Sequence, residues 1–336
     1  MMNPKRRTAL ILGLVFMVVL TCFCMAASLS LGSKSLPLSA VWHHYWWGES
    51  GSYYDLVINT REPRTLIGLM AGAALALAGA VTQGLLRNPL GDPGLLGVNA
   101  GAAATVVCFS FIPVLDGIPR FWTAFIGAGL STLLFYLLSG GSRHTNPVRL
   151  VLTGAAINTC LFALVQGVIL LSPQVMDSYR FWSIGSLSSM SLNEASLLIP
   201  YLLLAVILAL SLGASLNVMV FGEGIAGSLG ANVARTRIVS LLSATMLAAA
   251  ATAMAGPIAF VGLAAPHLMR ALVGNDFRWL LPYCLLAGSC LLLISDIVAR
   301  LLIAPEEIMV GIITASIGAP LLYLVAKSRS QKMMAE

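Results

Sequence analysis

Nine stretches of this 336-residue chain contain no Asp, Glu, Lys or Arg and are long enough to cross a lipid bilayer. About 20 residues of helix span about 30 Å of hydrocarbon. The bilayer core offers no water to the backbone, so a chain of this kind is driven to form helices. The sequence therefore predicts an all-α, polytopic membrane protein. The stretches are 8–33, 65–86, 93–115, 121–142, 150–176, 195–222, 238–269, 279–295 and 308–326.

The stretch 238–269 is too long for one crossing and contains Gly256-Pro257, a pair that interrupts a helix by removing a backbone donor. Dividing it gives ten spans. Basic residues flank both ends of the chain, at 5–7 and 327–332, and positive charge stays in the cytoplasm. Both termini are therefore expected inside, which requires an even count. With ten spans, 13 of the 19 Lys and Arg fall on cytoplasmic segments, so the net charge of +6 is interpreted as an orientation signal.

Several kinds of chemistry are excluded for this chain, which we treat as one domain, residues 1–336. No Lys follows a Gly, so the chain has no phosphate-binding P-loop of its own. The motifs GxSxG and HExxH are absent, and no carboxylate lies near the middle of a span, where proton-driven carriers usually need one. All six Cys lie in apolar runs without CxxC spacing, so neither a metal site nor a cofactor of this subunit is expected.

The segment "FGEGIAGSLGANVARTR" (221–237) is the predicted cytoplasmic connection between spans six and seven. Its small residues permit short helices and tight turns whose backbone comes close to a partner. Leu229 supplies an apolar knob and Glu223 a lone acid. We interpret the segment as a docking surface formed by Gly222, Glu223, Ala226, Leu229 and Gly230; an ordinary flexible loop is the alternative.

Two further polar features lie near the membrane. The inner turn "RNPLGDPGLLGVNAG" (87–101) breaks regular helix and is interpreted as part of a cytoplasmic gate, with a rigid structural turn as the alternative. Its candidate residues are Asn88, Pro89, Pro93 and Gly94. In span five, Thr159 and Gln166 lie seven apart and share one helix face, with Asn158 beside them. This face predicts a pathway lining; the alternative is hydrogen bonding that merely holds helices together.

A weak internal repeat in the sequence supports a transporter. "RTLIGLMAGAALALAGA" opens span two from outside, and "RTRIVSLLSATMLAAAATA" opens span seven from inside. Inverted repeats of this sort are a common way to build two alternating gates.

Long segments of the chain resemble the permease subunits of ABC importers for iron-siderophore, haem and cobalamin complexes. They are "REPRTLIGLMAGAALALAGAVTQGLLRNPLGDPGLLGVNAGA", "NPVRLVLTGAAI", "RFWSIGSL", "GEGIAGSLGANVARTR", "GPIAFVGLAAPHLMRALVGNDFRWLLP", "DIVAR" and "GIITASIGAPLLYLV". The resemblance implies an inverted-repeat, type II importer fold in a bacterial inner membrane. It also implies that the segment of about 213–237 forms coupling helices in a cleft of an ATPase subunit.

The partners implied by the resemblance are cytoplasmic ATPase subunits, which bind ATP-Mg, a second permease subunit, identical or different, and a periplasmic binding protein. The motif set is most similar to ferric-catecholate permeases, so a ferric siderophore is the expected cargo, with haem or cobalamin as alternatives. An ion-coupled secondary transporter is the alternative from another class. Nucleic acid is not an expected partner.

The resemblance also assigns a role to Arg61, Arg64 and Arg300 at the outer mouths of spans two and nine. Family arginines at these places meet glutamates of the binding protein, a task suited to the bidentate guanidinium. The acids Glu62, Glu306 and Glu307 are close enough in sequence to pair with the arginines instead. Ordinary membrane anchoring is the alternative for each Arg.

Overall fold

The computed structural model describes residues 4–48, 53–112, 114–115, 117–140, 147–320 and 323, and every regular element in them is helical. The elements are α1 (Pro4–Ser30), α2 (Leu38–Trp47), α3 (Tyr53–Leu86), η1 (Pro93–Leu96), α4 (Val98–Phe111), α5 (Arg120–Leu138), α6 (Pro147–Leu171), α7 (Pro173–Ile184), α8 (Leu192–Ser211), α9 (Gly213–Met219), α10 (Glu223–Ser228), α11 (Val233–Ala255), α12 (Val261–Val273), α13 (Phe277–Leu302) and a last helix, Val310–Pro320.

Seven described helices are long and apolar enough to cross a membrane, and three shorter apolar helices accompany them. The long ones are α1, α3, α5, α6, α8, α11 and α13; the shorter ones are α4, α12 and the last helix. The all-helical, polytopic class predicted from the charge-free stretches is confirmed. The basic residues after position 326 lie outside the described part of the chain.

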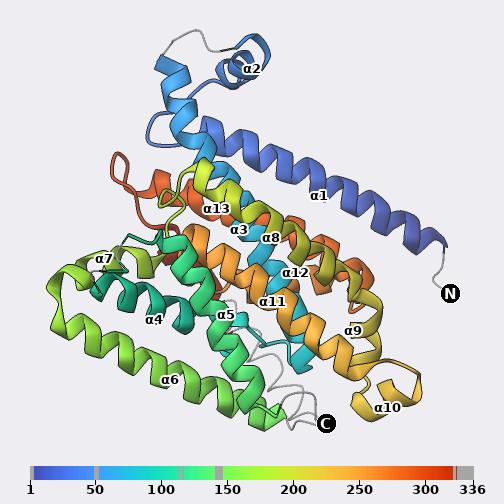
Figure 1. Cartoon of the computed structure of the whole chain (residues 1–336). Coiled ribbons are helices and arrows are strands. Elements are labelled where there is room, and N and C mark those ends of the chain that lie inside the picture. Colours follow the sequence, from blue (N-terminus) through green and yellow to red (C-terminus); the bar gives the residue numbers. More distant parts are fainter. Residues whose placement is uncertain are drawn as a thin grey trace.

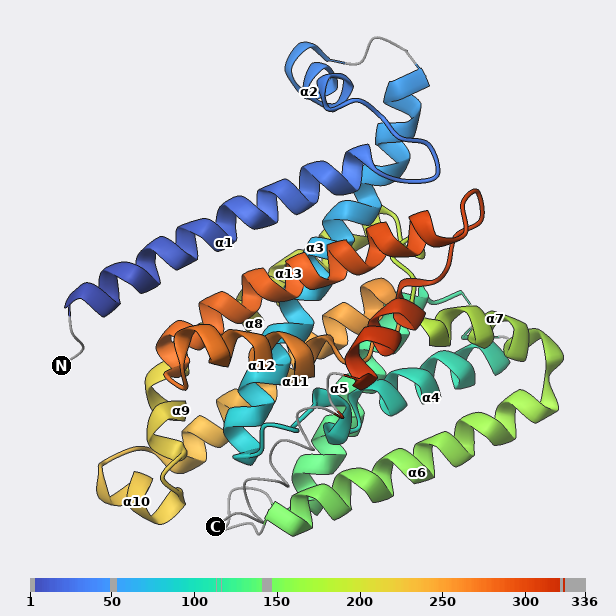
Figure 2. The same cartoon turned by 180° about the vertical axis from the view of Figure 1, so that it is seen from behind.

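The helices form one bundle in which α3 and α11 are central, and α1 and α6 lie at opposite edges (Figures 1 and 2). About four-fifths of the most apolar part of α3 is buried (78%), against 17% of that of α6. The edge helices therefore present apolar side chains outward, as expected for helices that face lipid or another subunit. Figure 1 also shows α2 and α10 at opposite ends of the bundle; these are called the α2 end and the α10 end below.

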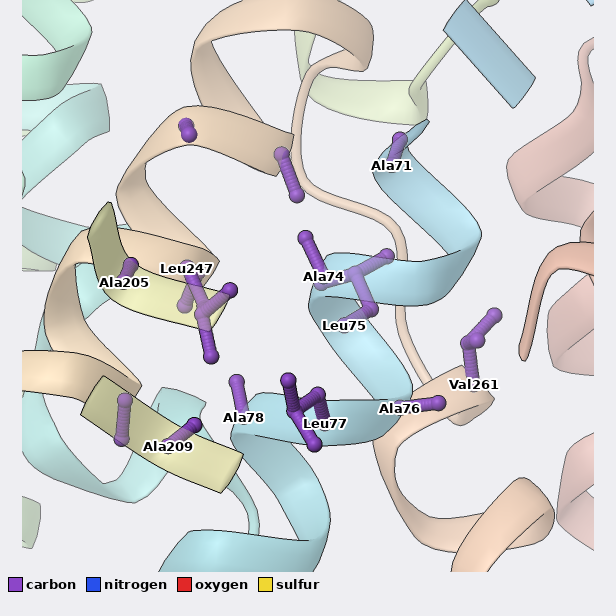
Figure 3. Packing of buried hydrophobic residues seen from close by; sticks show 14 of the residues in the cluster. Ala71, Ala74, Leu75, Ala76, Leu77, Ala78, Ala205, Ala209, Leu247 and Val261 are labelled. Atoms are coloured by element: carbon purple, nitrogen blue, oxygen red, sulfur yellow. The ribbon is translucent and has the colours of Figure 1, made fainter. Parts of the chain in front are cut away.

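Small residues allow the central helices to approach closely. Figure 3 shows Ala74 and Ala78 of α3 beside Leu247 of α11 and Ala209 of α8. The backbones of α3 and α12 meet where a Cβ atom on Gly79 would lie only 1.9 Å from the carbonyl oxygen of Gly262. Such a contact excludes any side chain at this position. Helix association in lipid depends on close packing of this kind, because the hydrophobic effect does not favour one apolar neighbour over another there.

Several helix ends differ from the charge-free stretches. Gly256, at φ +73, ends α11, and α12 begins only at Val261, so the predicted interruption at Gly256-Pro257 is confirmed. The stretch from Pro93 does not enter a helix directly. A short 3-10 turn comes first, and Gly97, at φ +83, separates it from α4. This agrees with the prediction that the turn 87–101 breaks regular helix, whereas the charge-free stretch marks only an apolar segment and carries no information on where the helix begins.

Two other stretches each contain two helices. In the stretch 150–176, α6 ends at Leu171 and Pro173 occupies the first turn of α7, where its missing N–H is harmless. In the stretch 195–222, α8 ends at Ser211 and α9 follows from Gly213. Both breaks place a short helix at one end of the bundle, α7 at the α2 end and α9 at the α10 end (Figure 1).

Candidate functional site

The α10 end carries an exposed apolar surface. Gly222, at φ +100, turns the chain into α10, a conformation that glycine adopts without steric cost. The side chains of Phe221, Ile225 and Leu229 then stand in the open, with exposed fractions of 66%, 54% and 66%. We call these three residues the α10 surface. A cluster of exposed apolar side chains is typical of a protein-binding surface.

The other predicted coupling residues hold this segment together. Ala226, on the inner side of α10, is fully buried. The carboxylate of Glu223 forms an ion pair with Arg237 of α11, whose side chain is only 6% exposed. Gly230 has a φ of +82, so a side chain there would strain the backbone whatever it contacted. The structure therefore places Leu229 in the exposed surface and Glu223 in a bond within the chain. The coupling role of all these residues stays a prediction.

The turn between α3 and α4 is an ordered, hydrogen-bonded segment. The Asn88 side chain accepts from the backbone N–H of Leu90 at 3.0 Å, and Asp92 caps η1 by accepting from Gly94 N at 2.7 Å. Pro93 is buried, whereas Pro89 is half-buried. These bonds fit the rigid turn as well as the gate, so the gate role stays a prediction.

Two predicted groups are brought together here. The amide of Asn158 in α6 donates to the carbonyl oxygen of Gly94 at 3.1 Å. One turn earlier in α6, a Cβ atom on Gly154 would lie 2.0 Å from the carbonyl oxygen of Leu95. Thus α6 packs directly on the η1 turn. Asn158 anchors the turn, which assigns it to a different surface from its sequence neighbour Thr159.

Thr159 and Gln166 share an exposed face of α6, as their spacing predicts. The Thr159 hydroxyl donates to Ala155 O within the same helix, at 2.9 Å. Such an internal bond satisfies the hydroxyl without a neighbouring helix. Among the described residues the face is exposed and the Thr159 hydroxyl bonds within its own helix, so hydrogen bonding between described helices of this chain does not account for Thr159. A pathway role for the face stays a prediction.

The three arginines at the α2 end are buried, with exposed fractions of 8% for Arg61, 9% for Arg64 and 2% for Arg300. Arg61 donates to the carbonyl oxygens of Leu29, Ser30 and Lys34, at 2.9, 3.0 and 2.6 Å. The guanidinium of Arg300 donates to the carbonyl oxygens of Ser28 and Leu31 and to the Ser28 hydroxyl, all within 3.0 Å. Helix α1 ends at Ser30, so these two arginines cap carbonyls that the helix itself leaves without partners.

Arg64 binds acids instead of carbonyls. Its Nε donates to Asp296 of α13 at 2.8 Å, and its Nη1 forms an ion pair with Glu307. Asp296 also meets Arg300 Nε at 3.1 Å. The third nearby acid, Glu62, bonds to Tyr45 of α2; burial, and then this carboxylate, raises the pKa of Tyr45 to about 12. Glu307 is therefore an internal partner of one of the arginines, Arg64, as predicted. Glu62 instead contacts Tyr45.

The sequence indicated which charged residues matter better than it indicated the side chains to which they bind. Asp296 and Arg300 are one helical turn apart, a spacing that favours an ion pair, and could have been found. Nothing in the sequence links Ser28 to Arg300, or Glu223 to Arg237 in particular. Among the described residues, no three His, Cys, Asp or Glu side chains gather where they could hold a metal ion.

A bundle of helices this long and this apolar defines a multi-pass membrane protein. The chain matches the model of the FecCD transport family over residues 17–328, and it belongs to that family. It is 41% identical to the ferric enterobactin transport system permease protein FepD of Escherichia coli, over 95% of both chains. It is 38% identical to the hemin transport system permease protein HmuU of Yersinia pestis, over 98% of this chain and 99% of the relative.

A solved structure described as an inward-facing conformation of a metal-chelate type ABC transporter has the same fold. Its TM-score is 0.80 and its identity 30%, over 94% of this chain and 98% of that one. The type II importer permease fold is thereby confirmed. The chain is the transmembrane component of a bacterial ABC importer and is not the ATP-hydrolysing subunit.

Proposed function

We propose that this permease takes up a ferric siderophore that a periplasmic binding protein delivers, with energy from ATP-Mg on partner ATPase subunits. The observation that carries the proposal is that an exposed apolar surface and a cluster of buried arginines lie at opposite ends of the bundle. The α10 surface of Phe221, Ile225 and Leu229 lies at one end of the bundle, and the arginine cluster lies at the other. The α10 end suits contact with an ATPase through its short helix. The α2 end suits a partner that carries carboxylates, because Arg64 there binds an exposed carboxylate, Glu307.

In this proposal the seven long and three shorter apolar helices make ten crossings, with both termini in the cytoplasm. An inverted repeat is supported by two similar successions. The long helix α3 is followed by a Pro- and Gly-containing break and the short α4, and α11 is followed by such a break and the short α12. The α10 end is then cytoplasmic and the α2 end periplasmic, as the basic residues near the N-terminus favour.

A second permease subunit, identical or different, completes the pathway. Helix α6 supports this part of the proposal, because most of its apolar surface is open and its exposed face carries Thr159 and Gln166. Two such faces would enclose a passage lined by hydroxyl and amide groups, which suit a cargo rich in oxygen atoms. No cofactor is required in this subunit.

The cargo is inferred from the relatives. A relative named for ferric enterobactin supports a ferric siderophore, and a relative named for hemin keeps haem as an alternative. Cobalamin is a further alternative. The runner-up class, an ion-coupled secondary transporter, is disfavoured because the buried carboxylate Asp296 is paired with two arginines at the α2 end of α13.

The test is reconstitution in liposomes with the candidate ATPase and binding protein, followed by uptake of labelled ferric enterobactin, haem and cobalamin. ATP-dependent uptake of the ferric siderophore alone is expected. Uptake of haem or cobalamin instead would correct the cargo. Uptake that proceeds without the ATPase and follows an ion gradient would contradict the whole proposal.

A further inference from the structure

The three buried arginines at the α2 end are not equivalent. Arg61 and Arg300 are each held by several oxygen atoms of the last turn of α1, so they act as the C-terminal cap of that helix. A partner that pulled either guanidinium away would leave backbone carbonyls without donors, which is costly inside a protein. These two arginines are therefore built into the fold and are poor candidates for exchange with an outside group.

Arg64 has one permanent partner and one accessible partner. The Asp296 side chain is 1% exposed and also binds Arg300, so it stays in place. The Glu307 side chain is 42% exposed and reaches Arg64 from the segment between α13 and the last helix. An exposed carboxylate gains little net free energy from its ion pair, because water solvates it nearly as well.

A cavity of about 420 Å³ opens beside this pair. Arg64 and Glu307 form part of its wall, and Lys34, Tyr53, Thr60 and Ser188 contribute ammonium and hydroxyl donors. A carboxylate entering the cavity would meet positive charge and hydrogen-bond donors, with Glu307 as the one acid in the wall. The cavity therefore has the chemistry of a carboxylate-binding site. Its place on Arg64 is occupied by the carboxylate of Glu307 from the same chain.

We propose that Glu307 occupies, within the permease, the place that a carboxylate of the docking binding protein takes on Arg64. This inference rests on the proposed function, because it presumes that a binding protein docks at the α2 end. Docking is then an exchange of one carboxylate for another at Nη1 of Arg64, while Asp296 stays bound to Nε. The exchange keeps a hydrogen-bond acceptor on Nη1, whose loss in a buried place would cost free energy.

The exchange has a consequence for the last helix. Glu307 is three residues from Val310, where the last helix begins, and Gly311 of that helix packs on the carbonyl oxygen of Ile184 at the end of α7. Release of Glu307 frees the segment that leads into the last helix. Docking at Arg64 is thereby linked to the position of that helix.

The experiment uses the permease with its ATPase in nanodiscs and measures the affinity of the loaded binding protein for three forms. Wild type is compared with Glu307→Gln, which removes the internal competitor, and with Glu306→Gln, which removes the same charge one residue away. Glu306 is exposed, and the structure records no ion pair for it among the described residues. Because an internal competitor lowers the apparent affinity by the fraction of sites it fills, Glu307→Gln is expected to bind about three- to tenfold more tightly. Glu306→Gln is expected to change the affinity by less than about twofold.

A second measurement needs no partner. Met309→Cys, in a background without accessible native thiols, is labelled with a membrane-impermeant maleimide with and without Glu307→Gln. Faster labelling in the double variant is expected, since Glu307 holds this segment on Arg64. Unchanged labelling would refute the internal contact.

The outcomes separate the inference from the function on which it rests. Weaker or equal binding by Glu307→Gln, or equal tightening by Glu306→Gln, overturns the exchange. If the wild type binds no binding protein at all while Met309→Cys labelling still responds to Glu307→Gln, the internal pair is real and the proposed docking fails.

Discussion

The side-chain amide of Asn158 in α6 donates a hydrogen bond to the carbonyl oxygen of Gly94, in the turn between α3 and α4, at 3.1 Å. This bond joins a residue predicted for the pathway to a residue predicted for the cytoplasmic gate. Because the bond joins α6 directly to the turn, we expect a movement of either one to affect the other.

Asn158→Ala is therefore expected to loosen the turn. A hydrogen bond of this kind contributes about 0.5–1.5 kcal/mol, which corresponds to about a two- to tenfold change in an opening equilibrium. Labelling of Leu95→Cys from the cytoplasmic side, without ATP, should rise by that factor. Thr159→Ala is the matched control, because in the described part of the chain the Thr159 hydroxyl bonds to Ala155 of its own helix. Equal labelling in the two variants would show that the Asn158 bond does not hold the turn.

Glu223→Gln is expected to destabilise the protein before it affects any partner. Arg237 is buried, and breaking a buried ion pair costs up to about 3–5 kcal/mol because the buried charge loses a partner. Thermal unfolding in detergent should show this loss, and the double variant Glu223→Gln/Arg237→Gln should recover most of it. Additive losses in the double variant would mean that the pair is not formed.

Leu229→Asp is expected to lower transport without lowering the stability of the protein. The Leu229 side chain is 66% exposed, so the thermal stability should stay within about 0.5 kcal/mol of wild type. ATP-driven uptake in liposomes should fall sharply, because a charge would enter an apolar contact with the ATPase. Normal uptake by this folded variant would exclude the α10 surface as the coupling site. It is a cleaner test than a bulky residue at Gly230, whose positive φ would add strain.

Gly79→Ala is expected to disrupt the centre of the bundle. The added methyl group would overlap the Gly262 carbonyl oxygen, and overpacking of this kind typically costs about 1–3 kcal/mol, or more where backbone must move. The yield of monodisperse protein after detergent extraction and its melting temperature should both fall. The control is Gly129→Ala in α5, which meets nothing within 4 Å. A Gly79→Ala protein as stable as this control would contradict the close contact of α3 and α12.

Ten crossings predict that the two ends of the bundle are reached from opposite sides of the membrane. An impermeant thiol reagent should label Arg180→Cys in α7 only from outside and Ser228→Cys in α10 only from inside, and tags at both termini should be accessible only from inside. The exposed native Cys22 and Cys160 are first replaced by Ser to remove background. Labelling of both engineered thiols from one side would refute the proposed topology.

The sequence by itself determined the class of the protein and several of its breaks. Charge-free stretches of about 20 residues leave a chain in lipid little choice but helix, because its backbone groups must bond to one another. Gly256-Pro257 predicted the end of α11 for an equally local reason, since proline lacks the N–H that the next turn would need. That Thr159 and Gln166 share one helix face follows from helical periodicity alone.

Only the tertiary structure decided which polar groups meet. Arg61, Arg64 and Arg300 occupy similar places in the sequence, yet two cap the end of α1 and one binds acids. Glu62 and Glu307 were equivalent candidates for these arginines, and the fold gives one to Tyr45 and the other to Arg64. An ion pair between residues more than 200 positions apart depends on the packing of whole helices, and a local pattern contains no measure of that packing. A charge near a helix end is therefore visible in the sequence, whereas its burial and its partner are properties of the assembled bundle.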